Sequence, residues 1–294
     1  MNPVAVAAPV ETAAPPAGRG GARRFVRRNP TLTAGAVILA LVAATSAAAP
    51  LFAGDPVSMV PARRLLPPSA DHWLGTDHLG RDIFARTVYG ARVSLFVGLA
   101  VALFSIALGL LVGLLAGYFR KVDAVVMRLM DGLMSIPAIL LAIALVALTR
   151  ASIATVIVAI TIPEIPRVVR LVRSVVLGVR DAPFVEAAIA GGTPTWKILL
   201  RHILPSTVSP LIVQATYICA SAILIEAALS FLGAGTPPDI PTWGNMIAQS
   251  RLFLSRAPWT IFAPGVALAL VVLAVNLLGD GLRDRLDPRL ARRM

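Results

Sequence analysis

The stretch VSLFVGLAVALFSIALGLLVGLLAGY, residues 93–118, decides the fold class of this chain. It contains no charged residue and is longer than the roughly 20 apolar residues that an α-helix needs to cross a bilayer core of about 30 Å. Gly109, Gly113 and Gly117 recur at every fourth position, so one face of the helix can pack closely against a second helix. The stretch therefore predicts a membrane-spanning helix with a small-residue packing face.

Five further apolar blocks flank this stretch, at residues 31–53, 129–149, 152–166, 211–232 and 261–278. Hydrophobic residues make up 57% of the chain, whereas an ordinary soluble domain has about 45–50%. We therefore expect an all-α polytopic membrane protein with about six transmembrane helices. The block at 152–166 is the weakest of the six, because it is short and because Pro163, Glu164 and Pro166 interrupt its end.

The basic residues predict which segments face the cytoplasm. The chain carries a formal net charge of +12, but its basic residues lie between the apolar blocks, which favours a membrane topology over binding to nucleic acid. With both termini in the cytoplasm, 19 of the 27 basic residues fall on the inner side, in accord with the positive-inside rule. Deleting the block at 152–166 would move the basic loop that follows it to the outside, so the charge distribution supports this crossing.

This topology divides the chain into inner and outer parts. It predicts a basic cytoplasmic tail at 1–30, a first transmembrane helix at 31–53, an extracytoplasmic segment at 54–92 and a cytoplasmic tail at 281–294. A cleaved signal peptide is the alternative for the N-terminal region, because residues 47–49 resemble a cleavage site and residues 22–27 resemble a twin-arginine signal. The length of the first block and the crossings that follow it favour an uncleaved anchor.

The sequence offers no set of residues for a metal or cofactor site. Cys219 is the only cysteine, and His72, His78 and His202 are scattered, so neither a disulfide framework nor a set of zinc ligands can be assembled. The phosphate-binding pattern G-x-x-x-x-G-K-[ST] does not occur. We therefore expect no cofactor and no ATP hydrolysis by this chain itself. A membrane enzyme is a weak alternative, because no nucleophile–base pair is visible.

The stretch RVVRLVRSVVLGVRDAPFVEAAIAGGTPTWKILLRHILPSTVSP, residues 167–210, lies on the predicted cytoplasmic side. Asp181 can cap a helix that has Pro183 in its first turn. Glu186 in that turn suits the positive end of the helix dipole. The pair Gly191-Gly192 is typical of a helix end. The pattern predicts a short helix that projects from the membrane surface.

A second short helix is expected at residues 196–203, closed by Pro205. The two helices would form a hairpin in a cytoplasmic loop at 167–206. The small side chains of Ala187, Ala188 and Ala190 would let another backbone approach closely. Two interpretations remain open, a docking surface for another protein and an amphipathic hairpin that lies on lipid.

The order of residues in this loop resembles a known motif. Glu186-Ala187-Ala188, followed after three residues by Gly192 and then by Leu204-Pro205, resembles the EAA loop of importer-type ABC permeases. The resemblance implies that residues 93–280 form the transmembrane domain of a type I ABC importer. It also implies that the helix with Glu186 inserts into a groove of a cytoplasmic ATP-binding subunit and transmits the motion of that subunit to the membrane helices.

Other stretches resemble one branch of these permeases, the C-type subunits of the dipeptide/oligopeptide/nickel branch. They are HWLGTDHLGRDIFARTVYGARVSL (72–95), SFLGAG (230–235), PTWGNMI (241–247) and NLLGDGLRDRLDPRL (276–290). The resemblance implies a bacterial inner-membrane permease that pairs with a homologous permease subunit and receives short peptides from an extracytoplasmic peptide-binding protein. Nickel and glutathione are alternative cargoes. A secondary transporter driven by an ion gradient is the alternative class, although no clear repeat is visible.

Charged residues near the apolar blocks need partners, because charge is costly in lipid. Glu226 lies deep in the block at 211–232 and is expected to face the bundle, bonded to Asn276 or to a serine, either as a structural group or as part of the translocation path. The expected ion pairs join Asp131 or Glu164 to Arg128 or Arg167 on the inner side, and Asp77 or Asp82 to Arg81 or Arg86 on the outer side. Trp73, Trp243 and Trp259 are expected to be interfacial anchors.

Overall fold

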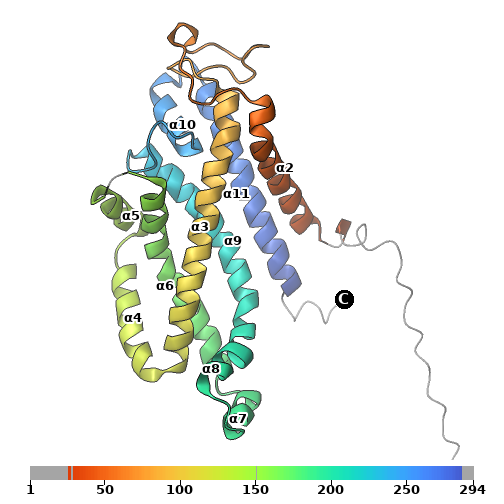
Figure 1. The fold of residues 1–294 in the computed structure, drawn as a ribbon, viewed down its shortest axis with the longest axis vertical. Coiled ribbons are helices and arrows are strands. Elements are labelled where there is room, and N and C mark those ends of the chain that lie inside the picture. The colour runs from red at the N-terminus through yellow and green to blue at the C-terminus, as the bar shows by residue number, and fades with distance from the viewer. Residues whose placement is uncertain (1–25, 28, 150, 287–294) are drawn as a thin grey trace, which may run out of the picture.

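The computed structural model describes residues 26–27, 29–149 and 151–286, and this part of the chain contains helices and no β-strand. Most of the predicted basic tail and the end of the C-terminal tail lie outside the described residues. Long helices run along a common axis (Figure 1). They are α2 (Pro30–Phe52), α3 (Ile83–Tyr118), α6 (Ile153–Val179), α9 (Leu204–Phe231) and α11 (Trp259–Leu286). Single turns of 3-10 helix cover Pro61–Arg63 and Arg251–Phe253.

Among the described residues, four helical stretches are long and apolar enough to cross a membrane: α2, α3, α11 and the continuous helix Thr195–Phe231. A fifth is formed by α4 (Arg120–Met134) and α5 (Ala138–Ala147), which meet at 85°. α6 has the length of a crossing, but every stretch of 18 residues within it contains Glu164, Arg167 and Arg170. The expected all-α polytopic membrane architecture is confirmed. The weakest block lies in α6, and its crossing of the membrane stays a prediction.

The glycine face predicted on residues 93–118 is an internal packing face between α3 and α6. Three glycines of α3 each meet one valine of α6, namely Gly109 with Val168, Gly113 with Val172 and Gly117 with Val176. A Cβ atom at these glycines would lie 2.4, 2.7 and 2.6 Å from the valine Cβ atoms, well inside van der Waals contact. The two backbones therefore approach each other along three helical turns, as small-residue faces allow.

Proline breaks a helix at one predicted position and leaves it continuous at others. The apolar block at 129–149 is divided between α4 and α5, because the chain turns at residues 135–137, where Pro137 has a non-helical ψ of 129°. Its ring disfavours helical geometry for the preceding residue. α6 instead continues through Pro163 and Pro166, both buried among neighbouring helices, where such neighbours compensate the lost hydrogen bonds.

The predicted loop at 167–206 is mostly helical. α6 extends to Val179, and α8 (Thr195–Lys197) runs through a π-helical turn (Ile198–Ile203) into α9. The expected closure at Pro205 is therefore wrong, since Pro205 lies in the first turn of α9, where proline is tolerated. Only residues 180–194 leave the bundle, and they carry α7 (Pro183–Ala190) at one end of the molecule (Figure 1).

Two arginines of α6 hold α4 against the bundle. Arg170 contacts Asp131 at 2.5 Å, and Arg173 contacts both carboxylate oxygens of Asp123, with Nη2 2.7 Å from Oδ2. Asp131 thus pairs with Arg170 and not with Arg128 or Arg167 as expected, whereas Glu164 does pair with Arg167, at 2.9 Å. Asp123 is the better covered of the two carboxylates, with its side chain 23% exposed against 61% for Asp131.

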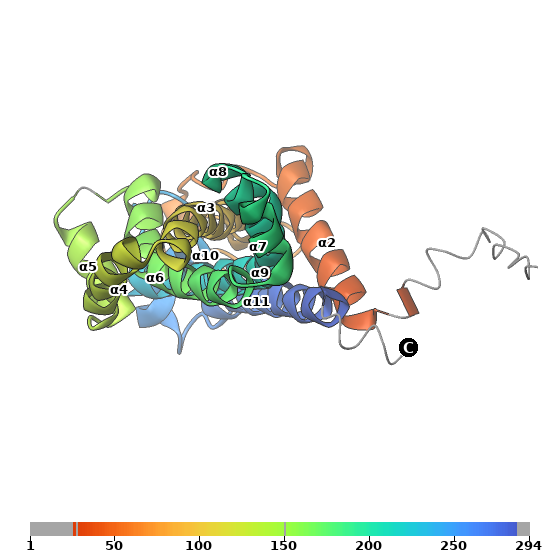
Figure 2. The ribbon, with the colours of Figure 1, turned by 90° about the horizontal axis from the view of Figure 1, so that it is seen from below.

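The first and last long helices form one flank of the bundle. Seen from below, α2 and α11 lie side by side, away from α4 and α5 (Figure 2). A Cβ atom at Gly35 of α2 would lie 2.5 Å from the Ala274 carbonyl oxygen of α11, so this contact also depends on glycine. α2 and α11 end short of the end that carries α7 (Figure 1).

The opposite end of the molecule is a cap built from residues 53–82 and α10 (Trp243–Ser250). Trp243 of α10 is 1% exposed, and its indole Nε1 donates a hydrogen bond to the Thr87 carbonyl oxygen at 3.0 Å. The prediction of an interfacial anchor is therefore wrong for Trp243, which joins α10 to α3 instead. Trp73, at 65% exposed, remains a surface residue.

Candidate functional site

α7 begins without the aspartate cap that the sequence predicts. Ala182 occupies the N-cap position, and its carbonyl oxygen accepts hydrogen bonds from the amides of Val185 and Glu186 at 2.9 and 3.1 Å. Asp181 lies one residue too early and contacts the side chain of Arg180 at 3.4 Å. Pro183 lies in the first turn as predicted, where its missing N–H and fixed φ suit a helix start.

α7 ends in a Schellman motif that requires a left-handed residue. Gly192 has φ +75°, a conformation that glycine adopts without cost. Its amide donates to the Ile189 carbonyl oxygen at 2.9 Å, and the Thr193 amide donates to the Ala188 carbonyl oxygen at 3.0 Å, the pair of bonds that defines this motif. The predicted helix end at Gly191-Gly192 is confirmed, and it turns the chain back toward the bundle.

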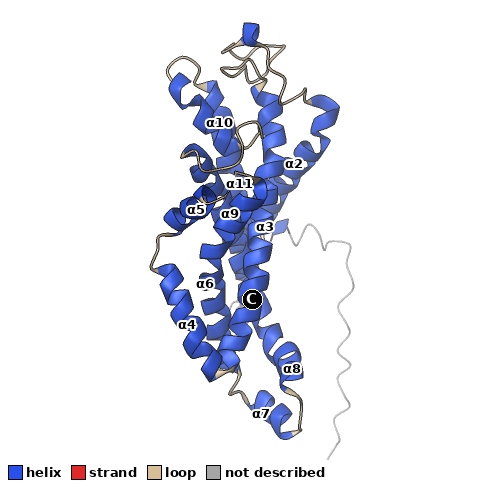
Figure 3. Ribbon diagram, turned by 60° about the vertical axis from the view of Figure 1, so that its left-hand side comes forward, coloured by secondary structure: helices blue, strands red, loops and turns tan. Residues whose placement is uncertain are grey.

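One side chain fixes α7 to the bundle, while most of the others face outward. Val185 is fully buried in the same cluster as Ile198 and Ile203 of the π-helical turn. We call the outward set Phe184, Glu186, Ile189 and Trp196 the α7 surface. Its three apolar members are 51%, 52% and 59% exposed, and the carboxylate of Glu186 forms no hydrogen bond or ion pair with the side chain or backbone of another described residue. Figure 3 shows α7 projecting beyond the lower ends of the long helices, with α8 above it.

The α7 surface is connected rigidly to the membrane helices. Arg180, just before α7, donates a hydrogen bond to the Gly117 carbonyl oxygen at the end of α3, at 3.2 Å. On the other side, α8 and the π-helical turn continue into α9 without a break. A force applied to α7 is therefore delivered to α3, α6 and α9 through short, packed connections rather than through a flexible loop.

The remaining predicted residues lie away from this surface. Leu204 and Pro205 begin α9, next to the π-helical turn. Glu226 lies near the opposite end of α9 and is fully buried; its Oε1 accepts hydrogen bonds from Ser230 at 2.9 Å and Thr236 at 3.5 Å. Asn276 is exposed on α11 and does not bond to Glu226, so of the two expected partners only the serine is confirmed.

The sequence did not reveal the role of Asn245, whose side chain bonds to the loop near Glu226. The Asn245 side-chain nitrogen donates to Thr236 Oγ1 at 2.9 Å and to the Pro237 carbonyl oxygen at 2.9 Å. Asn245 is 5% exposed, and its four acceptors all lie in the loop before α10. The only signal in the sequence is a polar residue inside an otherwise apolar helix face. In the described part of the chain, no three potential metal ligands come together.

Comparison with known proteins decides the class. Residues 105–292 match the family described as "Binding-protein-dependent transport system inner membrane component". The chain belongs to this family. The matched region includes α6, α7, α9, α10 and α11, and therefore both the α7 surface and Glu226. The resemblance to importer-type permeases, stated above on the EAA-like loop, is confirmed.

Individual relatives in this family cover nearly the whole chain. The probable peptide ABC transporter permease protein y4tQ of Sinorhizobium fredii is 60% identical, over 92% of this chain and 93% of its own length. The dipeptide transport system permease protein DppC of Alkalihalophilus pseudofirmus is 43% identical, over 90% and 88%. The glutathione transport system permease protein GsiD of Pectobacterium atrosepticum is also 43% identical, over 91% and 90%.

A solved structure shows the same fold. An inward-facing structure of the MetNI methionine ABC transporter superposes with a TM-score of 0.55 at 22% identity, covering 69% of this chain and 96% of the other. At this identity the likeness concerns the fold alone. The expected fold of a type I ABC importer transmembrane subunit is confirmed.

Proposed function

We propose that this permease is one of two transmembrane subunits of an ABC importer for short peptides, and that it forms half of the translocation path. The importer class follows from the family, and the peptide cargo is supported by relatives named as peptide and dipeptide permeases at 60% and 43% identity. Glutathione, named for another relative, is itself a small peptide. None of the relatives named above is described as an ion-coupled transporter.

The observation that carries this proposal is the α7 surface. A short helix held rigidly between two long helices, with apolar side chains about half exposed, needs a partner to cover it. A cytoplasmic ATP-binding subunit fits, because this chain contains no phosphate-binding loop of its own. Glu186, Ala187, Ala188 and Gly192 form the contacting part, with Leu204 and Pro205 at the return into α9.

The orientation in the membrane and the other partners follow from the same proposal. The α7 end and both termini face the cytoplasm of a bacterium, and the cap of residues 53–82 with α10 faces outward. A homologous permease subunit completes the path within the transmembrane domain 93–280, and an extracytoplasmic binding protein delivers the peptide to the cap. Glu226 has a structural role in this scheme, supported by its bonds to Ser230 and Thr236.

Reconstitution tests the proposal. The permease is assembled in liposomes with its partner permease, ATP-binding subunits and binding protein, and peptide uptake is measured together with ATP hydrolysis. Glu186→Lys reverses the charge of the α7 surface and Gly192→Asp disturbs its end, so each is expected to lower peptide-stimulated uptake by about tenfold or more, the effect of losing ~1.4 kcal/mol of docking energy.

The control is Ser174→Lys, which introduces a lysine at an exposed position of α6 outside α7. It is expected to keep uptake and ATP hydrolysis near the original level. Normal uptake by Glu186→Lys and Gly192→Asp would refute docking through α7. Uptake of an inorganic ion in place of peptides by the unaltered complex would refute the cargo while leaving the docking role intact.

A further inference from the structure

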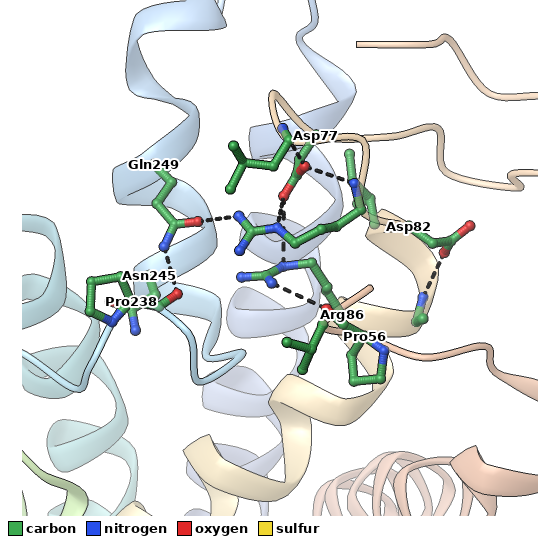
Figure 4. Close-up of polar contacts among 12 residues, drawn as sticks. Pro56, Asp77, Asp82, Arg86, Pro238, Asn245 and Gln249 are labelled. Atoms are coloured by element: carbon green, nitrogen blue, oxygen red, sulfur yellow. Dashed lines mark hydrogen bonds and ion pairs between the residues drawn. The ribbon is translucent and has the colours of Figure 1, made fainter. Parts of the chain in front are cut away.

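Two arginines are buried in the cap beside one shared carboxylate, that of Asp77 (Figure 4). Arg81 and Arg86 are 2% and 1% exposed. Asp77, 6% exposed, lies 2.6 Å from Arg81 Nε and 3.9 Å from Arg86 Nε, and it is their only acidic partner within 4 Å in the described part of the chain. The neighbouring Asp82 is used elsewhere, capping the Ala85 amide at 2.8 Å and contacting His72 at 2.7 Å.

The hydrogen bonds of the two guanidinium groups are unequal. Arg81 Nη2 donates to the side-chain oxygen of Gln249 on α10 at 2.6 Å. Arg86 Nη1 donates to the Pro56 carbonyl oxygen at 3.2 Å. Arg86 Nη2, in contrast, is buried and has no hydrogen-bond partner among the described residues. A buried donor of a charged group without an acceptor is costly.

The cluster of Arg81, Arg86 and Asp77 carries a net positive charge. Both guanidinium groups remain protonated at neutral pH, so the cluster carries one excess positive charge. Burial lowers the pKa of His78, against an opposite influence of Asp77, and the nearby Arg81, Arg86 and Arg64 lower it further. Arg86 also lies in the first turn of α3, where the positive end of the helix dipole adds to its charge. The excess charge of the cluster and the helix dipole favour an anion at this position.

Arg86, which carries the unpaired nitrogen, lines a small cavity. Its volume is about 10 Å³, and its wall includes Arg86, Gln249, Ser250 and Thr260, together with Asp77. The hydroxyl-bearing residues Ser250 and Thr260 are 4% and 2% exposed. This volume admits one atom-sized occupant, about the size of a water molecule, and it is too small for a carboxylate, a phosphate or a partner's side chain.

We propose that this cavity binds a halide ion, chloride under physiological conditions, held by Arg86 Nη2 and by the Ser250 hydroxyl group. Thr260 lines the cavity but does not donate to the ion, because its hydroxyl group donates to the Ala257 carbonyl oxygen at 2.7 Å. The ion neutralises the excess charge and lies where four segments meet: residues 53–82, the start of α3, α10 and the start of α11. It thereby stabilises the cap. The proposal concerns an ion that stays bound, and it is independent of which cargo crosses the membrane.

The intact transporter complex in detergent tests this site. Its thermal unfolding is followed in sodium chloride, sodium bromide and sodium gluconate at equal ionic strength. Chloride and bromide are expected to raise the midpoint by about 3–6 °C in a saturable manner, while gluconate, which is too large, does not. Arg86→Gln is expected to abolish the halide response. Arg92→Gln is the control, because Arg92 bonds to the Ser46 and Ala47 carbonyl oxygens outside the cavity.

A bromide-soaked crystal provides a second measurement on the unaltered protein, with an anomalous peak expected between Arg86, Ser250 and Thr260. Equal midpoints in halide and gluconate, together with no peak, would show that the cavity holds only water and would overturn the proposal. An unchanged halide response in Arg86→Gln would place the halide elsewhere and would overturn it too. If Arg86→Gln fails to assemble, the anomalous peak alone decides.

Discussion

At the scale of single residues, Gly192 is the position where backbone conformation matters most to the α7 surface. Its φ of +75° is costly for any residue with a Cβ, but a Cβ there would meet nothing within 4 Å. Gly192→Ala is therefore expected to cost about 1–2 kcal/mol by loosening the last turn of α7, with no effect on packing. Hydrogen exchange of the amides at 187–193 is expected to quicken by about 5–30-fold.

Gly191→Ala is the matched control for Gly192→Ala, since Gly191 has φ −75° and accepts an alanine without strain. Gly192→Asn is expected to recover part of the protection, because asparagine visits the left-handed region more readily than alanine. Similar exchange rates for Gly191→Ala and Gly192→Ala would show that the Schellman motif does not hold this helix end.

At the scale of helices, the contact between α4 and α6 depends on two ion pairs that differ in burial. The side chains of Asp123 and Arg173 are 23% and 31% exposed, whereas those of Asp131 and Arg170 are 61% and 44% exposed. A double-mutant cycle of Asp123→Asn and Arg173→Gln, read by thermal unfolding, is expected to give about 1 kcal/mol of coupling. The same cycle at Asp131 and Arg170 is expected to give less than about 0.5 kcal/mol, because solvent screens that pair.

The difference between the two cycles is expected to shrink in high salt, which screens exposed charges first. Equal coupling energies in both cycles, or none in either, would show that α4 is held by apolar contacts alone. The Asp123–Arg173 pair joins α4 to α6, and α6 leads directly into α7. Loss of this pair is therefore expected to let α4 move independently of α7.

The sequence predicts a helix well where the length and hydropathy of the segment determine it. It predicts a helix poorly where the packing of neighbouring helices determines whether the segment stays helical. The apolar length of residues 93–118 is a local property, and it predicted a crossing. Pro137 and Pro163 each lack an N–H, yet only the first lies at a break, because the cost of a lost hydrogen bond depends on what surrounds the ring. The α7 helix end was predictable from Gly191-Gly192, whereas the Arg81–Gln249 contact was not, since its members are 168 positions apart.

At the scale of the whole molecule, the lengths of the helices constrain where a bilayer can lie. α3, with 36 residues, is about 54 Å long, and a bilayer core takes up only about 30 Å of that. α2, with 23 residues, is about 34 Å long and ends short of α7 (Figure 1). The bilayer therefore surrounds the level shared by α2 and α11, and the α7 surface stands away from lipid, which favours protein docking over a hairpin lying on the membrane.

Cysteine labelling tests this placement and the direction of insertion together. In a Cys219→Ser background, single cysteines replace Ala70 and Asp239 at the cap, and Lys197 beside α7, all exposed positions. A membrane-impermeant maleimide is expected to label the two cap cysteines in spheroplasts, because few positive charges hold that end inside. The cysteine at position 197 is expected to react only in inside-out vesicles. The reverse pattern would place α7 outside the cell, where no ATP-binding subunit could reach it, and the proposed function would fail with it.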